Sequence, residues 1–509
     1  MLDNSVKLPD WLARCAENFP KRLALRCGEE RWTFAELHQR SEQMARRLAS
    51  IGVEEGSLVA LLAVNSSGFV TIVHALTRLG AVLVPLNTRL TIRELIWQLQ
   101  DVGAVLLISD AWHAEAASEI GLAMPGLARA TLAAKASGGE HVLAELPEAA
   151  LAPRREIDLE APQVIMYTSG TTGTPKGVII TYGMQWWNAI GSALNMGHQP
   201  DDCWLACLPL FHIGGLSILM RSVIYGISVV LFEKFDAVAV NRSIREDRVT
   251  MISVVAVMLQ RMLAELDERG EALDRPYGSA ALRCVLLGGG PAPRPLLEDC
   301  ARRNIPVVQT YGLTESCSQA VTLAPAEALR RLGSAGRPLL PVQLRIMQDG
   351  KSVGAGQPGM IMLKGPTITS GYAGRAEETA RAFQDGWFAT GDLGYLDDEG
   401  YLYVLDRRSD LIISGGENVY PAEIEAVLLA HPAVEEAGVC GVEDERWGQV
   451  PIAFVCLRSG HSASVEELLA HAQARLARYK LPRALHIVER LPRNSAGKLL
   501  RRELIHLIF

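Results

Sequence analysis

The sequence predicts an α/β fold: a large N-terminal domain of helix-covered sheets that includes a small β-subdomain, followed by a small α+β C-terminal domain. Helical and strand patterns alternate along the N-terminal part, and the strand segments there are continuously apolar. Such strands are typical of parallel sheets covered by helices. Beyond Gly333 the strands become shorter and are separated by Gly and Asp turns, which predicts the β-subdomain. With 509 residues, 49% of them hydrophobic, the chain can form a large core and more than one domain.

Capping boxes and apolar runs place the elements of the N-terminal part. Thr33-x-x-Glu36 and Thr91-x-x-Glu94 each predict the start of an amphipathic helix. Further helices are expected around residues 68–79 and from 186 onward, and strands at 58–64, 81–86, 105–109, 163–167, 204–208, 229–232, 249–254 and 284–287. The Ala-rich segment 125–156 has a weak pattern and is expected to be a surface connection.

A charged segment at residues 406–410 separates the two predicted domains. We therefore expect an N-terminal domain at residues 1–407 and a C-terminal domain at residues 408–509. Just before the boundary, residues 397–400 predict a hairpin turn that leads into a strand at 401–405. In the C-terminal domain, helices are expected at 422–429 and 465–479, and strands at 451–457 and 486–488.

Composition and charge exclude several classes of function. Lys and Arg number 50 against 57 Asp and Glu, and the resulting net charge of −7 argues against a nucleic-acid partner. The N-terminus lacks the basic and apolar regions of an export signal, and the apolar run at 222–232 is far shorter than the roughly 20 residues that cross a bilayer. The nine cysteines, without zinc-type spacing, are expected to be reduced and buried. We therefore expect a cytoplasmic protein without a membrane span.

The segment from Tyr167 to Gly177 reads YTSGTTGTPKG and follows a predicted strand. Its glycines let backbone amides approach an anion closely, its hydroxyls add donors, and Lys176 adds a positive charge. A Walker A loop has a glycine directly before its lysine, whereas Pro175 precedes Lys176 here. The segment therefore predicts a phosphate-binding loop of another type, and a glycine-rich surface turn without a ligand is the alternative.

Two other segments carry weaker signals. Gly288, Gly289 and Gly290 follow a predicted strand and precede a helix, which is typical of a turn that forms a binding site. Lys498 directly follows Gly497, and composition alone predicts that it is a solvated loop residue.

Five separated motifs together resemble the adenylate-forming superfamily, which comprises acyl-CoA synthetases, adenylation domains and luciferases. These motifs lie, in order, at residues 168–177, 311–315, 390–392, 406–410 and 497–498. The resemblance covers essentially the whole chain and implies a two-step reaction with ATP, Mg²⁺ and coenzyme A. A carboxylate attacks the α-phosphate of ATP to give an acyl-adenylate and pyrophosphate, and a thiol, commonly that of coenzyme A, then displaces AMP. Because charge develops on phosphate oxygens in the first step, fixed cations and amide donors are the main catalytic resource.

The same resemblance implies a role for each motif residue. The β- and γ-phosphates are assigned to Thr168, Ser169, Gly170, Thr171, Thr172, Gly173 and Lys176. Adenine is assigned to Gly289, Gly290, Gln309 and Tyr311, with Gly312 beside them, and the ribose hydroxyls to Asp392 and Arg407. Thr314 is assigned to the α-phosphate and Glu315 to Mg²⁺. A carboxylate suits the ribose because it can accept two hydroxyl hydrogen bonds, and Mg²⁺ prefers a few carboxylate oxygens together with phosphates and water.

Lys498 gains a catalytic role from the resemblance. In the family the equivalent lysine bridges the carboxylate and the α-phosphate, and it leaves when the small C-terminal domain rotates. The C-terminal domain is therefore expected to be mobile, with Arg408 and Ser409 as the hinge. Gly415 and Gly416 are expected to line the thiol tunnel for coenzyme A after the rotation.

The resemblance also narrows the acid. His212 resembles the gating aromatic position at the mouth of the acyl pocket, although a lone histidine is more often a packed structural residue. The stretches at 185–195, 204–212, 286–293 and 315–319 look like the o-succinylbenzoyl-CoA synthetases of menaquinone biosynthesis. That acid has an aromatic ring and two carboxylates, so the carboxylate that is not activated needs donors or a cation. Candidates for this contact, which the sequence does not rank, are Ser318, Gln319, Arg221 and His212.

The sequence departs from the family pattern at two positions, and it also leaves several alternative functions open. Gly214 lies where relatives often have Ser, and Met360 replaces the usual acidic residue of a Gly-Glu pair. The change at Gly214 puts a hydrogen bond of the acyl pocket in doubt, and the change at Met360 puts a surface contact in doubt. The alternatives are an acyl-CoA ligase for another aryl or medium-chain acid, a carrier-loading adenylation enzyme, and a binding homologue without catalysis. A homodimer is one assembly that the sequence leaves open.

Overall fold

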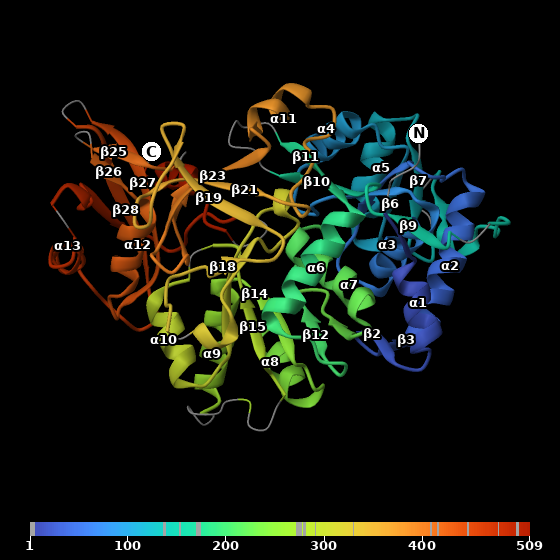
Figure 1. Cartoon of the computed structure of the whole chain (residues 1–509), viewed down its shortest axis with the longest axis horizontal. Helices are drawn as coiled ribbons and strands as arrows, with labels where there is room; N and C mark the ends of the chain where they lie inside the picture. Colours follow the sequence, from blue (N-terminus) through green and yellow to red (C-terminus); the bar gives the residue numbers. More distant parts are fainter. Residues whose placement is uncertain are drawn as a thin grey trace.

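The computed structural model describes nearly the whole chain (Figure 1). The described residues are 6–135, 139–151, 154–168, 175–270, 277, 281–290, 292–328, 330–407, 410–414, 417–444, 447–476, 478–494 and 498–508. They form two large helix-covered sheets, a smaller antiparallel sheet and a C-terminal sheet with its own helices, as the sequence predicts.

The first large sheet has the strand order β11-β10-β5-β4-β6-β7-β8. Its strands are β4 (Leu58–Leu62), β5 (Val82–Pro85), β6 (Leu106–Ser109), β7 (Ala128–Thr131), β8 (His141–Val142), β10 (Pro162–Thr168) and β11 (Lys176–Thr181). All neighbours are parallel except β10 and β11. Strands β5 and β6 are fully buried, and β4 is buried except at Leu58, as their continuous apolar sequence requires. The helices of this region are α2 (Phe34–Ser50), α3 (Ser67–Leu79), α4 (Ile92–Val102) and α5 (Ala114–Ala123), and both predicted capping boxes are present.

One part of this sheet was not predicted. The segment 125–156, expected to be a surface connection, contributes β7 and β8, and it continues to β9 (Glu156–Asp158). Ala130 and Thr131 of β7 are buried. The prediction was wrong because β7 is only four residues long and reads ARAT, which lacks a continuous apolar run.

The second large sheet has the strand order β18-β17-β16-β15-β14-β12-β13-β2-β3. Its strands are β2 (Leu23–Cys27), β3 (Glu30–Thr33), β12 (Cys203–Ala206), β13 (Ser228–Leu231), β14 (Met251–Val254), β15 (Cys284–Leu287), β16 (Val307–Tyr311), β17 (Val321–Thr322) and β18 (Arg337–Pro338). The helices that accompany it are α1 (Trp11–Asn18), α6 (Tyr182–Met196), α7 (Ile213–Tyr225), α8 (Ala237–Glu246), α9 (Ala256–Glu268) and α10 (Arg294–Arg302). One hydrophobic core joins side chains of both sheets with those of α1, α2, α3, α6 and α7, so α6 and α7 pack in the middle of the molecule (Figure 1).

The smaller sheet and the C-terminal sheet follow on either side of the predicted domain boundary. The antiparallel sheet contains β19 (Gln343–Gln348), β20 (Lys351–Ser352), β21 (Gly359–Lys364), β22 (Phe383–Gln384), β23 (Trp387–Leu396) and β24 (Leu402–Arg407). The C-terminal sheet contains β25 (Ile412–Ser414), β26 (Glu417–Val419), β27 (Val434–Asp444), β28 (Gly448–Leu457) and β29 (Ala484–Ile487), with α12 (Pro421–Leu429) and α13 (Val465–Gln473) beside it. It lies at the opposite end of the molecule from the first sheet (Figure 1).

Three details of this part differ from the sequence prediction. Strand β24 continues through Arg407, so the charged break begins later than residue 406. Helix α13 ends at Gln473 instead of continuing to 479, and β27, an 11-residue partner of β28, was missed. All nine cysteines are free, and no helix in the described part of the chain has the length and apolarity to cross a membrane.

Candidate active site

The predicted phosphate-binding loop connects two antiparallel strands. Thr168 at the end of β10 pairs with Lys176 at the start of β11, so the loop is the tip of a hairpin. A Walker A loop instead joins a strand to a helix, and the topology therefore agrees with the distinction made from the sequence. Ser169, Gly170, Thr171, Thr172 and Gly173 lie outside the described residues.

Tyr372 links Lys176 to Glu315. Its hydroxyl donates a hydrogen bond of 3.1 Å to Glu315 Oε1, and the Nζ of Lys176 lies 5.1 Å from the centroid of its ring. Burial and the neighbouring Glu315 raise the pKa of the Tyr372 phenol, so the phenol keeps its proton and donates. Val178 and Tyr372 form an isolated antiparallel bridge, which brings these distant segments together. The structure thus places the predicted phosphate lysine and the predicted magnesium ligand around one tyrosine that the sequence analysis missed.

Thr314 and Glu315 lie in a short 3-10 helix, η3 (Thr314–Ser316), directly after β16. The backbone oxygen of Glu315 accepts a 2.8 Å hydrogen bond from the N–H of Thr369, which fixes this turn to the segment that carries Tyr372. The preceding Gly312 is packed closely against the next loop, because a Cβ at this position would lie 1.5 Å from the backbone oxygen of Ser318. Only glycine fits this contact.

The residues predicted to bind adenine come together at one edge of the second sheet. Leu287 pairs with Gln309 across the parallel strands β15 and β16, so Gly289, Gly290 and Tyr311 follow at the carboxyl ends of adjacent strands. Such edges are where α/β sheets bind ligands. Gln309 is buried, and its Nε2 has no hydrogen-bond partner among the residues that the structure describes. A buried amide donor without a partner fits a nucleotide base that accepts a hydrogen bond.

The residues predicted to bind ribose lie next to this edge. The Tyr311 hydroxyl donates a 2.8 Å hydrogen bond to Asp392 Oδ2, which connects the second sheet to β23 of the antiparallel sheet. Asp392 pairs in register with Arg407 on β24, so both predicted ribose residues occupy opposing strand positions. The hydrogen bond from Tyr311 orients the carboxylate.

His212 lies directly before α7 and is mostly buried. Its ring is 4.7 Å from that of Phe211, and burial, with a smaller contribution from Arg89, lowers the pKa of His212 to about 4. The imidazole is therefore neutral at neutral pH, which excludes a permanent positive charge at this position. At Gly214 a Cβ would meet only Leu208 Cδ1, at 3.5 Å, so the backbone leaves room for the serine that relatives often have.

The C-terminal residues of the prediction are described in part. The backbone N–H of Lys498 donates a 2.8 Å hydrogen bond to Asn494 Oδ1, and the Asn494 N–H donates to the Lys498 oxygen, so Lys498 closes a turn in the C-terminal domain. Arg408, Ser409, Gly415 and Gly416 lie outside the described residues.

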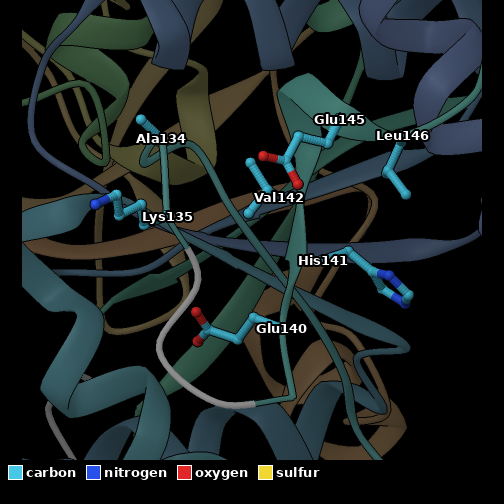
Figure 2. Close-up of a pocket in the computed structure, with 7 residues that line it drawn as sticks. All are labelled: Ala134, Lys135, Glu140, His141, Val142, Glu145 and Leu146. Carbon is cyan, nitrogen blue, oxygen red and sulfur yellow. The ribbon is translucent and has the colours of Figure 1, made fainter.

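A separate hollow of about 520 Å³ lies at the far edge of the first sheet (Figure 2). Its lining comes from β8 and the segments beside it: Ala134, Lys135, Glu140, His141, Val142, Glu145 and Leu146. None of the predicted site residues lines it. The hollow is therefore distinct from the candidate active site.

Comparisons with known proteins cover both domains. A model of the AMP-binding enzyme family matches residues 12–373, and a model of the AMP-binding enzyme C-terminal domain matches residues 423–498. The 2-succinylbenzoate–CoA ligase of Geobacillus kaustophilus is 54% identical over 501 residues, which cover 98% of each protein.

Two solved structures of o-succinylbenzoate CoA synthetase from Bacillus subtilis are similar along the whole chain. The complex with the acyl-adenylate intermediate has a TM-score of 0.89 at 44% identity and covers 98% of each chain. The complex with ATP and a magnesium ion has a TM-score of 0.88 at 44% identity, covering 98% of this chain and 100% of the other. These similarities confirm the family predicted from the motifs: the chain belongs to the AMP-binding enzyme family.

Proposed function

We propose that this protein is an AMP-forming acid–thiol ligase that converts 2-succinylbenzoate into its coenzyme A thioester through an acyl-adenylate, as a step of menaquinone biosynthesis. The observation that carries the proposal is the 54% identity, over 98% of both chains, to a protein named 2-succinylbenzoate–CoA ligase. The carboxylate attacks the α-phosphate of ATP and pyrophosphate leaves. The thiol of coenzyme A then displaces AMP from the acyl group.

The described geometry supports a nucleotide site at the edge of the second sheet. In our proposal Gln309 supplies its unpaired buried Nε2 to adenine, while the turn at Gly289 and Gly290 lets the backbone approach the base. Asp392, held by Tyr311, binds the ribose hydroxyls together with Arg407 on the opposing strand. The phosphates then extend toward Thr314 and the hairpin tip that follows Thr168.

Glu315 fits a magnesium ion in a nucleotide site. In the part of the chain that the structure describes, no group of three or more His, Cys, Asp or Glu residues could form an all-protein metal site. A single carboxylate completed by phosphate oxygens and water is the arrangement that Mg²⁺ prefers. The bound ion would neutralise charge on the phosphate oxygens. Lys176, above the Tyr372 ring, would add a second positive charge on the leaving pyrophosphate.

The second half-reaction is assigned to the C-terminal domain, which we place at residues 408–509 after an N-terminal domain at 1–407. We propose that Lys498 joins the site for adenylation and leaves it when this domain rotates about Arg408 and Ser409. Gly415 and Gly416 would then line the path of the coenzyme A thiol. The ends of the two sheets support this division, because β24 ends at Arg407 and β25 begins at Ile412.

The proposal also covers the cellular location of the enzyme and its oligomeric state. We propose that the enzyme acts in the cytoplasm on small molecules, without a nucleic-acid partner, because its nine cysteines are free and its net charge is −7. A homodimer is the assembly we propose to test. Multi-angle light scattering of the purified protein would give about twice the chain mass of 55.3 kDa for a homodimer, and a value near the chain mass would contradict it.

The reaction can be tested with purified protein, ATP, Mg²⁺, coenzyme A and a panel of acids. We expect acid-dependent release of pyrophosphate, and thioester formation, to be fastest with 2-succinylbenzoate. Preference for another aryl or medium-chain acid would contradict the proposed substrate but not the reaction. Thiolation of a carrier phosphopantetheine but not of free coenzyme A would indicate a carrier-loading enzyme. ATP binding without adenylation of any acid would indicate a binding homologue.

A further inference from the structure

One arginine joins two separate parts of the C-terminal domain. Arg501 lies three residues after Lys498, at the start of the 3-10 helix η6 (Arg501–Leu507). Its Nε and Nη2 donate hydrogen bonds of 2.8 and 2.7 Å to the two carboxylate oxygens of Glu425 on α12. Its Nη1 donates a 3.2 Å hydrogen bond to Asp410 Oδ2. We refer to Asp410, Glu425 and Arg501 as the Arg501 triad.

The contacts of the Arg501 triad have the geometry of a strong ion pair. The two hydrogen bonds to Glu425 match the planar guanidinium, and such paired contacts fix orientation as well as distance. The side chains of Glu425 and Arg501 are 8% and 14% exposed, so solvent and salt screen this pair less than a surface pair. Glu425 Oε1 also accepts a 2.9 Å hydrogen bond from the N–H of Val439 on β27. Arg501 is therefore held in one position relative to the C-terminal sheet.

The segment that carries Lys498 leads directly into the triad. Lys498 closes a turn with Asn494, and Leu499 follows it. Leu499 lies against β27, because a Cβ added to Gly438 would be 3.2 Å from Leu499 Cδ2. Arg501 comes two residues later. The chain between Lys498 and the triad is therefore short and packed on the sheet, so a displacement of Arg501 would displace Lys498 as well.

Asp410 connects the triad to the predicted hinge. It directly follows Arg408 and Ser409 in the sequence and lies just before β25. The hydrogen bond from Arg501 to Asp410 spans 91 positions, so it joins the end of the C-terminal domain to its beginning. A rotation about the hinge can place Lys498 accurately only if the hinge and the segment of Lys498 move as one rigid unit.

We propose that Arg501 is a positioning residue for adenylation. By joining Asp410 and Glu425, it makes the start of the C-terminal domain, α12 and the segment of Lys498 move together. The rotation then brings the amine of Lys498 to the α-phosphate. This inference rests on the proposed function, in which Lys498 acts in the first half-reaction. The purely structural alternative is that the triad only stabilises the C-terminal domain, and its loss would then affect both half-reactions.

The two half-reactions separate positioning from stability. Adenylation is measured as acid-dependent exchange of pyrophosphate into ATP, and thiolation as conversion of supplied acyl-adenylate into thioester. For Arg501→Met we expect kcat of adenylation to fall about 100-fold, because a displacement of about 1 Å near the reacting atoms has an effect of that size. KM for ATP, and the rate of thiolation, should change by less than about threefold, because the other predicted ATP contacts lie in the N-terminal domain and Lys498 has left before thiolation. Arg501→Lys keeps the charge but loses the paired hydrogen bonds, and kcat of adenylation should fall only about tenfold.

Lys480→Met is the matched control. The Nζ of Lys480 donates a 2.7 Å hydrogen bond to Glu423 Oε1, so the variant removes another ion pair of α12 at residues outside the triad. It should change pyrophosphate exchange by less than about twofold.

Three results would overturn the inference: unchanged adenylation in Arg501→Met, equal losses of adenylation and thiolation in that variant, or an equal loss of adenylation in Lys480→Met. If Arg501→Met does not fold, the same comparison of half-reactions in Arg501→Lys decides. Failure of the wild-type protein to catalyse exchange with any acid would instead refute the proposed function, and full exchange in Lys498→Ala would refute the role proposed for Lys498.

Discussion

The contact between Tyr372 and Glu315 gives the sharpest prediction about catalysis. Tyr372→Phe removes the hydroxyl that donates to Glu315 Oε1 but keeps the ring below Lys176. Tyr372→Leu removes both. If the hydroxyl orients Glu315 for Mg²⁺, the first substitution should weaken the binding of Mg²⁺, and the second should in addition remove the aromatic contact of Lys176.

The hydrogen bond to Glu315 and the cation–π contact with Lys176 differ in the free energy they contribute. A hydrogen bond to a charged group contributes roughly 1.5–3 kcal/mol, and the 3.1 Å length at Tyr372 is long for an O–H donor, so the lower value applies. About 1.5 kcal/mol corresponds to roughly tenfold in affinity. A cation–π contact at a partly exposed site adds about 0.5–1 kcal/mol, or roughly two- to fivefold. We therefore expect binding of Mg²⁺ and ATP to weaken about tenfold in Tyr372→Phe and about twenty- to fiftyfold in Tyr372→Leu.

The assay is acid-dependent pyrophosphate release at fixed ATP over a range of Mg²⁺ concentrations. Tyr372→Phe should raise the half-saturating Mg²⁺ concentration about tenfold and leave the rate at saturating Mg²⁺ nearly unchanged. Tyr395→Phe is the control, because Tyr395 stacks on Tyr403 at a centroid distance of 5.0 Å in the antiparallel sheet, away from Glu315. An unchanged Mg²⁺ dependence in Tyr372→Phe would refute the reasoning that its hydroxyl positions the metal ligand.

Three further predictions concern the other parts of the protein. Lys498→Ala should abolish acid-dependent pyrophosphate release but still convert supplied acyl-adenylate into thioester, and equal loss of both rates would contradict the domain rotation. Gly312→Ala should lower the free energy of unfolding in urea by about 1–3 kcal/mol, because its Cβ would meet the Ser318 oxygen at 1.5 Å, whereas the matched change Gly354→Ala, in open space, should have almost no effect. Burial lowers the pKa of His74 from 6.5 to about 4, so unfolding takes up a proton below pH 6.5, and the stability present above pH 6.5 is lost as the pH falls toward 4. His74→Leu should remove about 2 kcal/mol of the loss in unfolding free energy between about pH 7.5 and about pH 5; an unchanged pH dependence would show that His74 is not its source.

Elements with a strong local pattern were predictable. The two capping boxes at Thr33 and Thr91 gave the correct helix starts, and β15 has the predicted bounds because its four apolar residues are followed by glycines. Strand β7 was not predicted, because its sequence ARAT forms a strand only when β6 pairs with it. Helix α13 was predicted too long because periodicity continues beyond Gln473, where the structure has turns. For β7, tertiary pairing and not local preference decided the structure.

The candidate site shows the same division between local and long-range information. The motif residues lie in segments whose composition is unusual, so they were visible in the sequence, and the structure brings Gln309, Tyr311 and Asp392 to one edge. Tyr372 was missed because it lies in an ordinary stretch, SGYAG, and its contact with Glu315 spans 57 positions. Nothing in the local sequence distinguishes a tyrosine that bonds to the predicted metal ligand from one that only packs.

Arg221 shows why a buried charge is harder to predict from sequence than a phosphate-binding loop. Phosphate chemistry requires glycines, hydroxyls and lysines at fixed spacing, and such spacing is visible along one segment. A buried cation is identified only by the side chains that surround it, and those around Arg221 come from α6, α7 and residues 316–319, which are far apart in the sequence. In the sequence Arg221 is one of 50 positively charged residues. It becomes distinctive only once folding has buried it, paired it with the neutral Asn188 and left its Nε without a hydrogen-bond partner in the described part of the chain.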